Sequence, residues 1–126
     1  MMHRQNNFSN IDTVKRLYEL FNERKWQEIA ALHSDNVYLL DSKIGTQFVL
    51  RKKTDVAQRY AAVERKYPGI QDRILFIQES GDMVYVQYMS KGRTRDGQAW
   101  EQLAWNIFTV DNGKIKKVAT YFSQPE

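Results

Sequence analysis

The last third of the chain alternates apolar and polar side chains in a way that predicts three consecutive strands. Residues 83–89 alternate with the period of two that a half-buried strand requires. Asp96-Gly97 and Asn112-Gly113 are turn dipeptides that tolerate a positive φ, so the chain can reverse at each of them. Residues 100–110 and 115–122 supply the two strands that follow these turns. We therefore expect an antiparallel meander over this part of the chain.

The first third of the chain has helical spacing instead. Apolar side chains between Ile11 and Phe21 fall on one stripe of a helix, and Ser9 or Asn10 can cap its first turn. After a polar break, a second short helix is predicted from Trp26 to His33.

Two short apolar runs and a third helix complete the upstream part. Residues 37–40 and 74–77 are predicted strands. Arg51–Lys53 marks a loop, and Thr54 is the predicted cap of a third helix over residues 54–67. Pro68-Gly69 ends this helix, because proline lacks an amide donor and glycine accepts a reversed backbone.

The order of these elements is ααβαββββ, with the helices early and the sheet late. This segregation is typical of an α+β fold rather than of a doubly wound α/β fold. A chain of 126 residues has the length of one domain. We expect that domain to occupy residues 11–126, preceded by a polar tail at residues 1–10.

Composition argues against several classes of function. The sequence has no cysteine, and its two histidines lack metal-ligand spacing, so we expect no disulfide, no metal and no cofactor. Residues 1–10 contain no apolar run and no stretch is long enough to span a membrane, which predicts a cytoplasmic protein. The net charge of +4 is a mild excess. Acidic residues are interspersed among the basic ones and no recognised nucleic-acid motif is present, which disfavours nucleic acid as a partner.

Four stretches of the chain resemble one superfamily. They are Phe21-Asn22, residues 29–41, residues 67–70 (Tyr-Pro-Gly-Ile) and residues 108–115, which contain the turn Asp-Asn-Gly-Lys. Together with the order of elements, they make residues 11–122 resemble the nuclear transport factor two-like superfamily. The resemblance is to its branch of SnoaL-like polyketide cyclases and ketosteroid isomerases.

This resemblance implies a cone, in which a curved mixed or antiparallel sheet wraps around the N-terminal helices. It implies a central pocket for a small organic ligand between the helices and the concave face of the sheet. It also implies a homodimer formed through the outer sheet face. The superfamily includes isomerases, cyclases, dehydratases, epoxide hydrolases and non-catalytic binding modules, so the fold alone does not decide the function.

Asp41 is the first candidate for a catalytic group. It follows four apolar residues at the end of a predicted strand, where partial desolvation would raise the pKa of its carboxyl group. The resemblance places Asp41 at the general-base position of the ketosteroid isomerases, which are a well-known example of catalytic groups with tuned pKa values. The alternative is that Asp41 caps the loop after the strand by bonding local amides. Both interpretations remain open from the sequence.

A base needs a partner that holds the oxygen on which charge develops. The resemblance places the isomerase tyrosine at Leu17, one residue before Tyr18, and the isomerase acid at Asn106. Asn106 can still donate a hydrogen bond, and Tyr18 is the remaining candidate for the tyrosine. The acid that cyclases often carry in the last strand is matched by Thr120. Steroid isomerisation is therefore not the expected reaction.

Strand alternation adds further side chains to the candidate pocket. Residues 102–108 present every second side chain to one face, and residues 118–122 do the same on the last strand. The resemblance makes these the pocket faces, with aromatic side chains of the helices opposite, although core packing is the alternative for each aromatic residue. His33 is interpreted as a hydrogen-bonded boundary residue. The predicted binding residues are Trp26, Tyr60, Gln102, Phe108, Val118, Thr120 and Phe122.

The leading hypothesis is a SnoaL-like protein whose pocket holds a small, largely apolar compound with a carbonyl or hydroxyl group. As an enzyme it would be an isomerase, cyclase or dehydratase, with Asp41 as the base and with Asn106 and Tyr18 orienting the substrate. The alternative is a non-catalytic ligand-binding or dimerisation module of the same fold. A basic nucleic-acid-binding protein ranks third.

Overall fold

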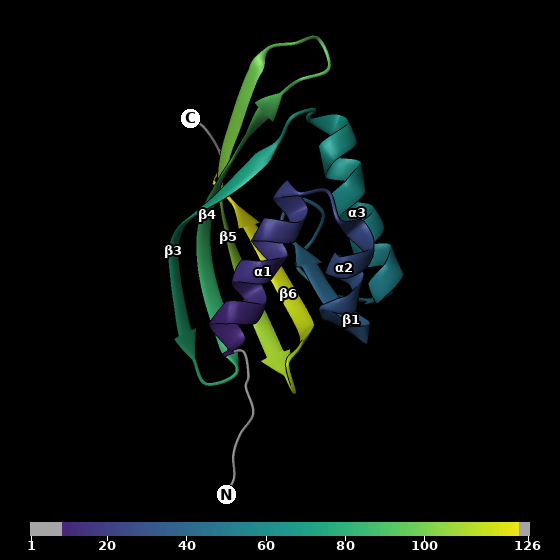
Figure 1. Cartoon of the computed structure of the whole chain (residues 1–126), viewed down its shortest axis with the longest axis vertical. Coiled ribbons are helices and arrows are strands. Elements are labelled where there is room, and N and C mark those ends of the chain that lie inside the picture. Colours follow the sequence, from purple (N-terminus) through teal and green to yellow (C-terminus); the bar gives the residue numbers. More distant parts are fainter. Residues whose placement is uncertain (1–8, 124–126) are drawn as a thin grey trace, which may run out of the picture.

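The computed structural model describes residues 9–123, in which three helices lie against one face of a six-stranded sheet (Figure 1). The predicted polar tail therefore falls almost entirely outside the described residues. Only Ser9 and Asn10 of that tail are described, and they begin the first helix. The architecture confirms the predicted α+β class.

Helix α1 (Asn10–Asn22) begins with a reciprocal cap. The Ser9 hydroxyl accepts a hydrogen bond from the Asp12 amide at 3.2 Å, and the Asp12 carboxylate accepts one from the Ser9 amide at 3.3 Å. This capping box satisfies amides that have no partner inside the helix. The predicted apolar stripe is buried against the sheet. Its buried members are Val14, Leu17, Tyr18, Leu20 and Phe21.

Helices α2 (Trp26–Ala31) and α3 (Lys53–Lys66) differ from the prediction at their ends. Because α2 stops at Ala31, His33 is the first residue of a strand and not the last residue of a helix. Thr54, the predicted cap of α3, lies inside the helix. A strand runs directly into α3, so the chain enters the helix earlier than the preference for a capping side chain indicates.

The sheet has the strand order β2-β1-β6-β5-β4-β3. Neighbouring strands are antiparallel except for β1 and β6, which are parallel, so the sheet is mixed. The strands are β1 (His33–Asp41), β2 (Val49–Lys52), β3 (Gln71–Ser80), β4 (Met83–Arg93), β5 (Ala99–Asp111) and β6 (Lys114–Phe122).

Strand β2 is the one addition to the predicted order of elements. The basic run Arg51–Lys53 predicts a loop here, but Arg51 and Lys52 belong to β2, which pairs with β1 at the edge of the sheet. All of its residues are exposed. A short exposed edge strand buries no face, so it lacks the alternating pattern by which strands are recognised.

The predicted meander is present as β4, β5 and β6. The chain reverses at Gly97, with φ of 90°, and at Asn112-Gly113, with φ of 52° and 75°. Glycine has no Cβ and asparagine tolerates this region, which explains both turn dipeptides. Along β4 the side chains alternate between buried and partly exposed, as the sequence pattern predicts.

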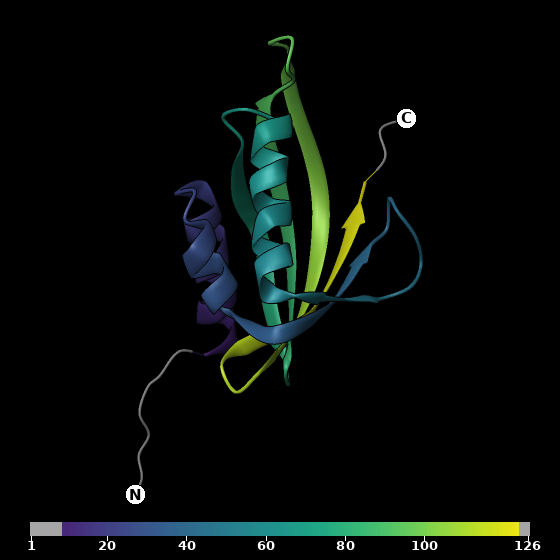
Figure 2. The same cartoon turned by 90° about the vertical axis from the view of Figure 1, so that its right-hand side faces the viewer.

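The sheet bends so that its concave face looks toward the helices (Figure 2). Helix α1 covers β3 and β4, and α3 covers β1. Between them, apolar side chains of α1 meet those of the meander in the core, where Leu17 and Phe108 are among the largest fully buried residues. Among residues 9–123, no helix is both long and apolar enough to cross a membrane.

Candidate functional site

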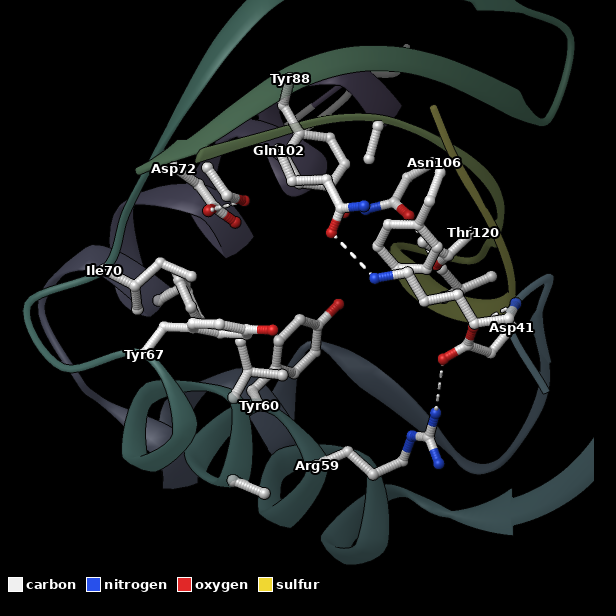
Figure 3. A pocket seen from close by; sticks show the side chains of 18 of the residues that line it. Asp41, Arg59, Tyr60, Tyr67, Ile70, Asp72, Tyr88, Gln102, Asn106 and Thr120 are labelled. Atoms are coloured by element: carbon white, nitrogen blue, oxygen red, sulfur yellow. Dashed lines mark hydrogen bonds and ion pairs between the residues drawn. The ribbon is translucent and has the colours of Figure 1, made fainter. Parts of the chain in front are cut away.

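A cavity of about 380 Å³ lies between α3 and the concave face of the sheet. Its lining comes from α1, β1, α3 and strands β3 to β6, so elements from the whole chain contribute to it. Most of the lining is apolar or aromatic, and a few polar side chains are placed among these groups (Figure 3). This volume and mixture are typical of sites for small organic molecules.

Asp41 lies in the cavity lining at the end of β1. Its Oδ1 accepts a hydrogen bond from the Lys43 amide at 2.9 Å, and its Oδ2 lies 3.5 Å from Nη2 of Arg59 on α3 (Figure 3). A quarter of its side chain is exposed. The structure thus gives Asp41 a cationic neighbour and a loop-capping bond, rather than the apolar setting that the preceding residues suggested. The loop-capping contact is thus present, and the role of Asp41 as a base stays a prediction.

Three polar side chains from separate elements form a chain of hydrogen bonds. Thr120 Oγ1 donates to Asn106 Oδ1 at 2.6 Å, and Asn106 Nδ2 donates to the Tyr18 hydroxyl at 2.9 Å. Asn106 and Thr120 are register partners on β5 and β6, and Tyr18 reaches them from α1. Burial, followed by the nearby Tyr88, raises the pKa of Tyr18 well above its ordinary value, so its phenol stays neutral.

This chain of bonds fixes the orientation of the Asn106 amide in the cavity lining. One amide hydrogen is donated to the Tyr18 hydroxyl, and the Asn106 side chain also interacts by hydrogen bonding with the nearby Tyr88 phenol. Tyr18 itself lies behind Asn106 and does not line the cavity. The structure therefore brings Tyr18 and Asn106 together, and of the two only Asn106 lines the cavity.

The predicted binding residues divide into two groups. Phe108 and Trp26 lie outside the cavity lining, which corrects their assignment to the pocket. Phe108 shares a strand face with Asn106, but it is fully buried in the core, where the Tyr18 ring from α1 packs edge-on against it. Trp26 packs edge-on against Phe21, which stands between it and the cavity. Those that do line the cavity are Tyr60, Gln102, Val118, Thr120 and Phe122.

A lysine that the sequence analysis did not select also reaches the cavity. Lys43 Nζ donates to Gln102 Oε1 at 3.0 Å and lies 4.2 Å from the centre of the Phe122 ring. The contact with the ring is of the cation–π type. Lys43 therefore adds a positive charge to the cavity lining, and its backbone amide binds the Asp41 carboxylate.

Asp72 is the most important cavity residue that the sequence analysis missed. It lies at the start of β3, lines the cavity, and accepts a hydrogen bond on Oδ1 from Ser90 Oγ at 2.5 Å. Burial raises the pKa of Asp72 from 3.8 to about 6, against the opposing effects of Ser90 and Arg24. A signal was present: Ile70, Asp72 and Ile74 occupy alternate positions, and extending the predicted strand backward would have turned Asp72 inward.

His33 lies outside the cavity and is buried at the start of β1. Its Nδ1 is 2.8 Å from the Ile29 carbonyl oxygen, and burial lowers the pKa of its imidazole to about 4. No cluster of three or more metal-binding side chains occurs among residues 9–123. The polar groups that line the cavity are carboxyl, amide, hydroxyl and phenol groups, together with the cationic side chains of Lys43, Arg59 and Lys66.

Comparison with known proteins identifies the family and the fold. A family model described as a SnoaL-like domain matches residues 14–118. The structure of wild-type IdmH from Streptomyces antibioticus, described as a candidate polyketide cyclase, aligns with a TM-score of 0.81 at 19% identity, covering 92% of this chain and 93% of that one. No curated protein matches this sequence.

Two further solved structures show the same fold. A ketosteroid isomerase-like protein from Catenulispora acidiphila, in complex with trimethylamine, gives a TM-score of 0.78 at 12% identity, with 89% and 85% of the two chains covered. A candidate SnoaL-like polyketide cyclase from Jannaschia gives 0.75 at 17% identity, with 95% and 92% covered. At these identities the similarity establishes the fold and does not transfer a substrate.

Proposed function

The chain belongs to the SnoaL-like domain family, and from this premise we propose that it is a cofactor-independent enzyme that moves a proton on a small, largely apolar compound. The compound carries a carbonyl or hydroxyl group, and the reaction is an isomerisation, cyclisation or dehydration. The observation that carries this proposal is the cavity itself. A mainly apolar space of about 380 Å³ contains carboxyl groups and an oriented amide at fixed points of its lining.

In this proposal Asp41 is the base that takes a proton from carbon. Arg59 and the Lys43 amide hold its carboxylate in one orientation, so little side-chain motion is needed when a molecule binds. The Asn106 amide is held by Thr120 and Tyr18, and on substrate binding it exchanges its contact with Tyr88 for a hydrogen bond to the oxygen on which charge develops. Loss of the carbon-bound proton to Asp41 leaves an enolate, and return of the proton to another atom completes an isomerisation.

Hydrogen–deuterium exchange on a simple ketone tests proton abstraction without knowledge of the natural substrate. β-Tetralone in deuterated buffer is followed by proton NMR, with wild type, Asp41→Asn and Asn106→Ala. We expect wild type to accelerate exchange, and Asp41→Asn to lower the rate by roughly a hundredfold or more. Asp111→Asn is the matched control, since this exposed carboxyl pairs with Lys116 and lies outside the cavity lining. Equal rates in wild type and Asp41→Asn would exclude Asp41 as the base.

A non-catalytic ligand-binding module is the second candidate. It is favoured by the engagement of both Asp41 oxygens, one with a loop amide and one with Arg59, as in a structural residue. The trimethylamine bound to the Catenulispora protein supports a small-ligand role for this fold. A binding module predicts that β-tetralone affinity survives Asp41→Asn and that no exchange occurs in any variant.

We also propose that the protein forms a homodimer through the outer face of the sheet. Phe76, Gln87, Trp105 and Tyr121 are successive register partners across β3, β4, β5 and β6. The three aromatic members are each more than a third exposed, and the Phe76 and Trp105 rings lie 5.9 Å apart. A row of exposed aromatic side chains across a sheet face is typical of a protein–protein interface.

A further inference from the structure

Asp72 is fixed in the cavity lining by bonds that do not involve a ligand. The Asn22 side chain, at the end of α1, binds its backbone twice: Nδ2 donates to the Asp72 carbonyl at 2.9 Å, and Oδ1 accepts from the Asp72 amide at 2.8 Å. Ser90, the register partner of Asp72 on β4, donates to its carboxyl Oδ1. The carboxyl group therefore has a set position before any molecule enters, as a reacting group requires.

No cation is paired with this carboxyl group in the part of the chain that the structure describes. The nearest candidate, Arg24, donates to the carbonyl oxygens of Ile70 at 2.6 Å and Phe21 at 3.1 Å, and lies 3.9 Å from the Glu64 carboxylate. Its charge is thus shared with other partners. Nor does any residue between 9 and 123 donate a hydrogen bond to Oδ2 of Asp72, which leaves that oxygen for a molecule in the cavity.

Desolvation, and not a neighbouring charge, favours the protonated form of Asp72. Burial is the main cause that raises the pKa of its carboxyl group to about 6, and Ser90 and Arg24 lower it only in part. Tyrosine phenols on the other packed elements lie near enough to interact electrostatically with Asp72, and burial raises their own pKa values, so they remain neutral. These groups are Tyr18 from α1, Tyr60 from α3 and Tyr88 from β4. A carboxyl group that titrates near neutral pH can serve as a proton donor.

Asp72 and Asp41 lie on opposite sides of the cavity (Figure 3). Asp41 has the Arg59 guanidinium beside it, whereas Asp72 has hydroxyl and phenol groups around it. Two carboxyl groups in contrasting environments are the usual arrangement for an acid and a base acting together. We propose that Asp72 is a second proton-transfer residue, the acid that protonates a substrate oxygen while Asp41 removes a proton from carbon. This assignment rests on the proposed function and completes it.

The reaction that uses both groups most directly is the dehydration of a β-hydroxy carbonyl compound. Asp41 takes the hydrogen from the carbon next to the carbonyl, and the electron pair of that bond forms a carbon–carbon double bond. The bond from the neighbouring carbon to the hydroxyl oxygen breaks, and the oxygen leaves as water with the Asp72 proton. The products are an unsaturated carbonyl compound and water. Asp41 then carries a proton and Asp72 is ionised, and exchange with solvent restores both.

An aryl diazo compound tests the donor role of Asp72 directly. Such a compound esterifies a carboxyl group only when that group is protonated. The carboxyl group first gives its proton to the diazo carbon, and the resulting carboxylate then displaces dinitrogen from that carbon to form the ester. Ionised carboxyl groups therefore do not react. The intact protein is treated with phenyldiazomethane about one pH unit below and about one above the Asp72 pKa of about 6, and the esters are located by peptide mass spectrometry. The protonated fraction falls about tenfold between these conditions.

We expect Asp72 to be esterified faster than the exposed Asp111 and to lose about tenfold in rate at the higher pH. Ser90→Ala removes a hydrogen bond that lowers the pKa of Asp72. In this variant the esterification rate of Asp72 should therefore fall at a higher pH than in wild type. A merely structural Asp72, closed to the cavity, would not show that displacement. Absence of an Asp72 ester while exposed carboxyl groups react, or a rate unaffected by Ser90→Ala, would overturn the proposal.

This experiment separates the failure of the two proposals. Labelling requires neither turnover nor Asp41, so Asp41→Asn should be labelled at Asp72 like wild type. If labelling succeeds and ketone exchange is absent, Asp72 is a proton donor in the cavity and Asp41 is not a base. If ketone exchange succeeds and Asp72 is not labelled, the enzyme uses Asp41 without this acid.

Discussion

Replacing Asp72 by asparagine gives the sharpest test of the electrostatics in the cavity. Burial raises the pKa of this carboxyl group from 3.8 to about 6, so the folded protein resists an ionisation that the unfolded chain undergoes freely. The difference is about two pKa units, and each unit corresponds to about 1.4 kcal/mol. Ionised Asp72 therefore costs the folded state about 3 kcal/mol at pH values well above 6.

The direction of the pH dependence follows from proton binding. Between pH 3.8 and about 6 the folded state binds more protons at Asp72 than the unfolded state does. The stabilising contribution of Asp72 is thus complete below 3.8 and is lost as the pH rises through about 6. Asparagine carries no charge and keeps an oxygen that accepts from Ser90. We expect Asp72→Asn to match wild type near pH 4 and to be more stable by up to about 3 kcal/mol at neutral pH.

Urea unfolding, followed by tryptophan fluorescence over a pH series, measures this difference. The comparison between variants is essential because His33 acts in the opposite direction. Burial lowers the pKa of its imidazole from 6.5 to about 4, so the unfolded state binds the extra proton there and stability rises with pH over that interval. Both proteins retain His33, so its contribution cancels. Asp111→Asn, at an exposed carboxyl, serves as the control.

The refuting result is a free-energy difference between Asp72→Asn and wild type that does not change between acidic and neutral pH. It would mean that the Asp72 carboxyl group is hydrated or paired in the folded protein. A variant that becomes less stable relative to wild type as the pH rises would refute the sign of the argument.

Three further changes test the fold and the proposed interface. Ser9→Ala removes the cap of α1 and should lower the free energy of unfolding by about 1 kcal/mol in urea, whereas no change would show that the capping box is unimportant. Gly92→Ala places a Cβ 3.1 Å from the Ile70 Cα and should cost about 1–3 kcal/mol, while Gly45→Ala, with open space around it, should be neutral. Trp105→Asp in the aromatic row should weaken the dimer by roughly thirtyfold or more in sedimentation equilibrium, and a wild-type monomer would remove the interface proposal.

The local elements of this fold could be read from the sequence because they depend on residues close together in the chain. The cap of α1 joins Ser9 to a residue three positions later, and each reversal of the meander depends on one dipeptide. Strand alternation likewise needs only neighbouring residues, so the half-buried strand β4 was predicted from its period of two. Strand β2 escaped because an exposed edge strand carries no such pattern.

The candidate site depends instead on residues that are distant in sequence. Asn106 bonds to Tyr18 across 88 positions, and Arg59 reaches Asp41 from another element. Alternation placed Phe108 on the correct strand face, but only the position of α1 decided that this end of the face lies in the core.

The sequence by itself determined the α+β class, the capped first helix, the meander and most of the side chains that face inward. Tertiary structure alone decided which inward-facing groups meet in the cavity and which of them titrates near neutral pH. The sequence singled out Asp41 because its neighbours along the chain are apolar. Asp72 has the charged Arg73 next to it in sequence, yet burial in the folded protein raises the pKa of Asp72 to about 6. Desolvation is set by everything that packs around a group, and for Asp72 those groups come from α1, α3 and β4, which only the folded chain brings together.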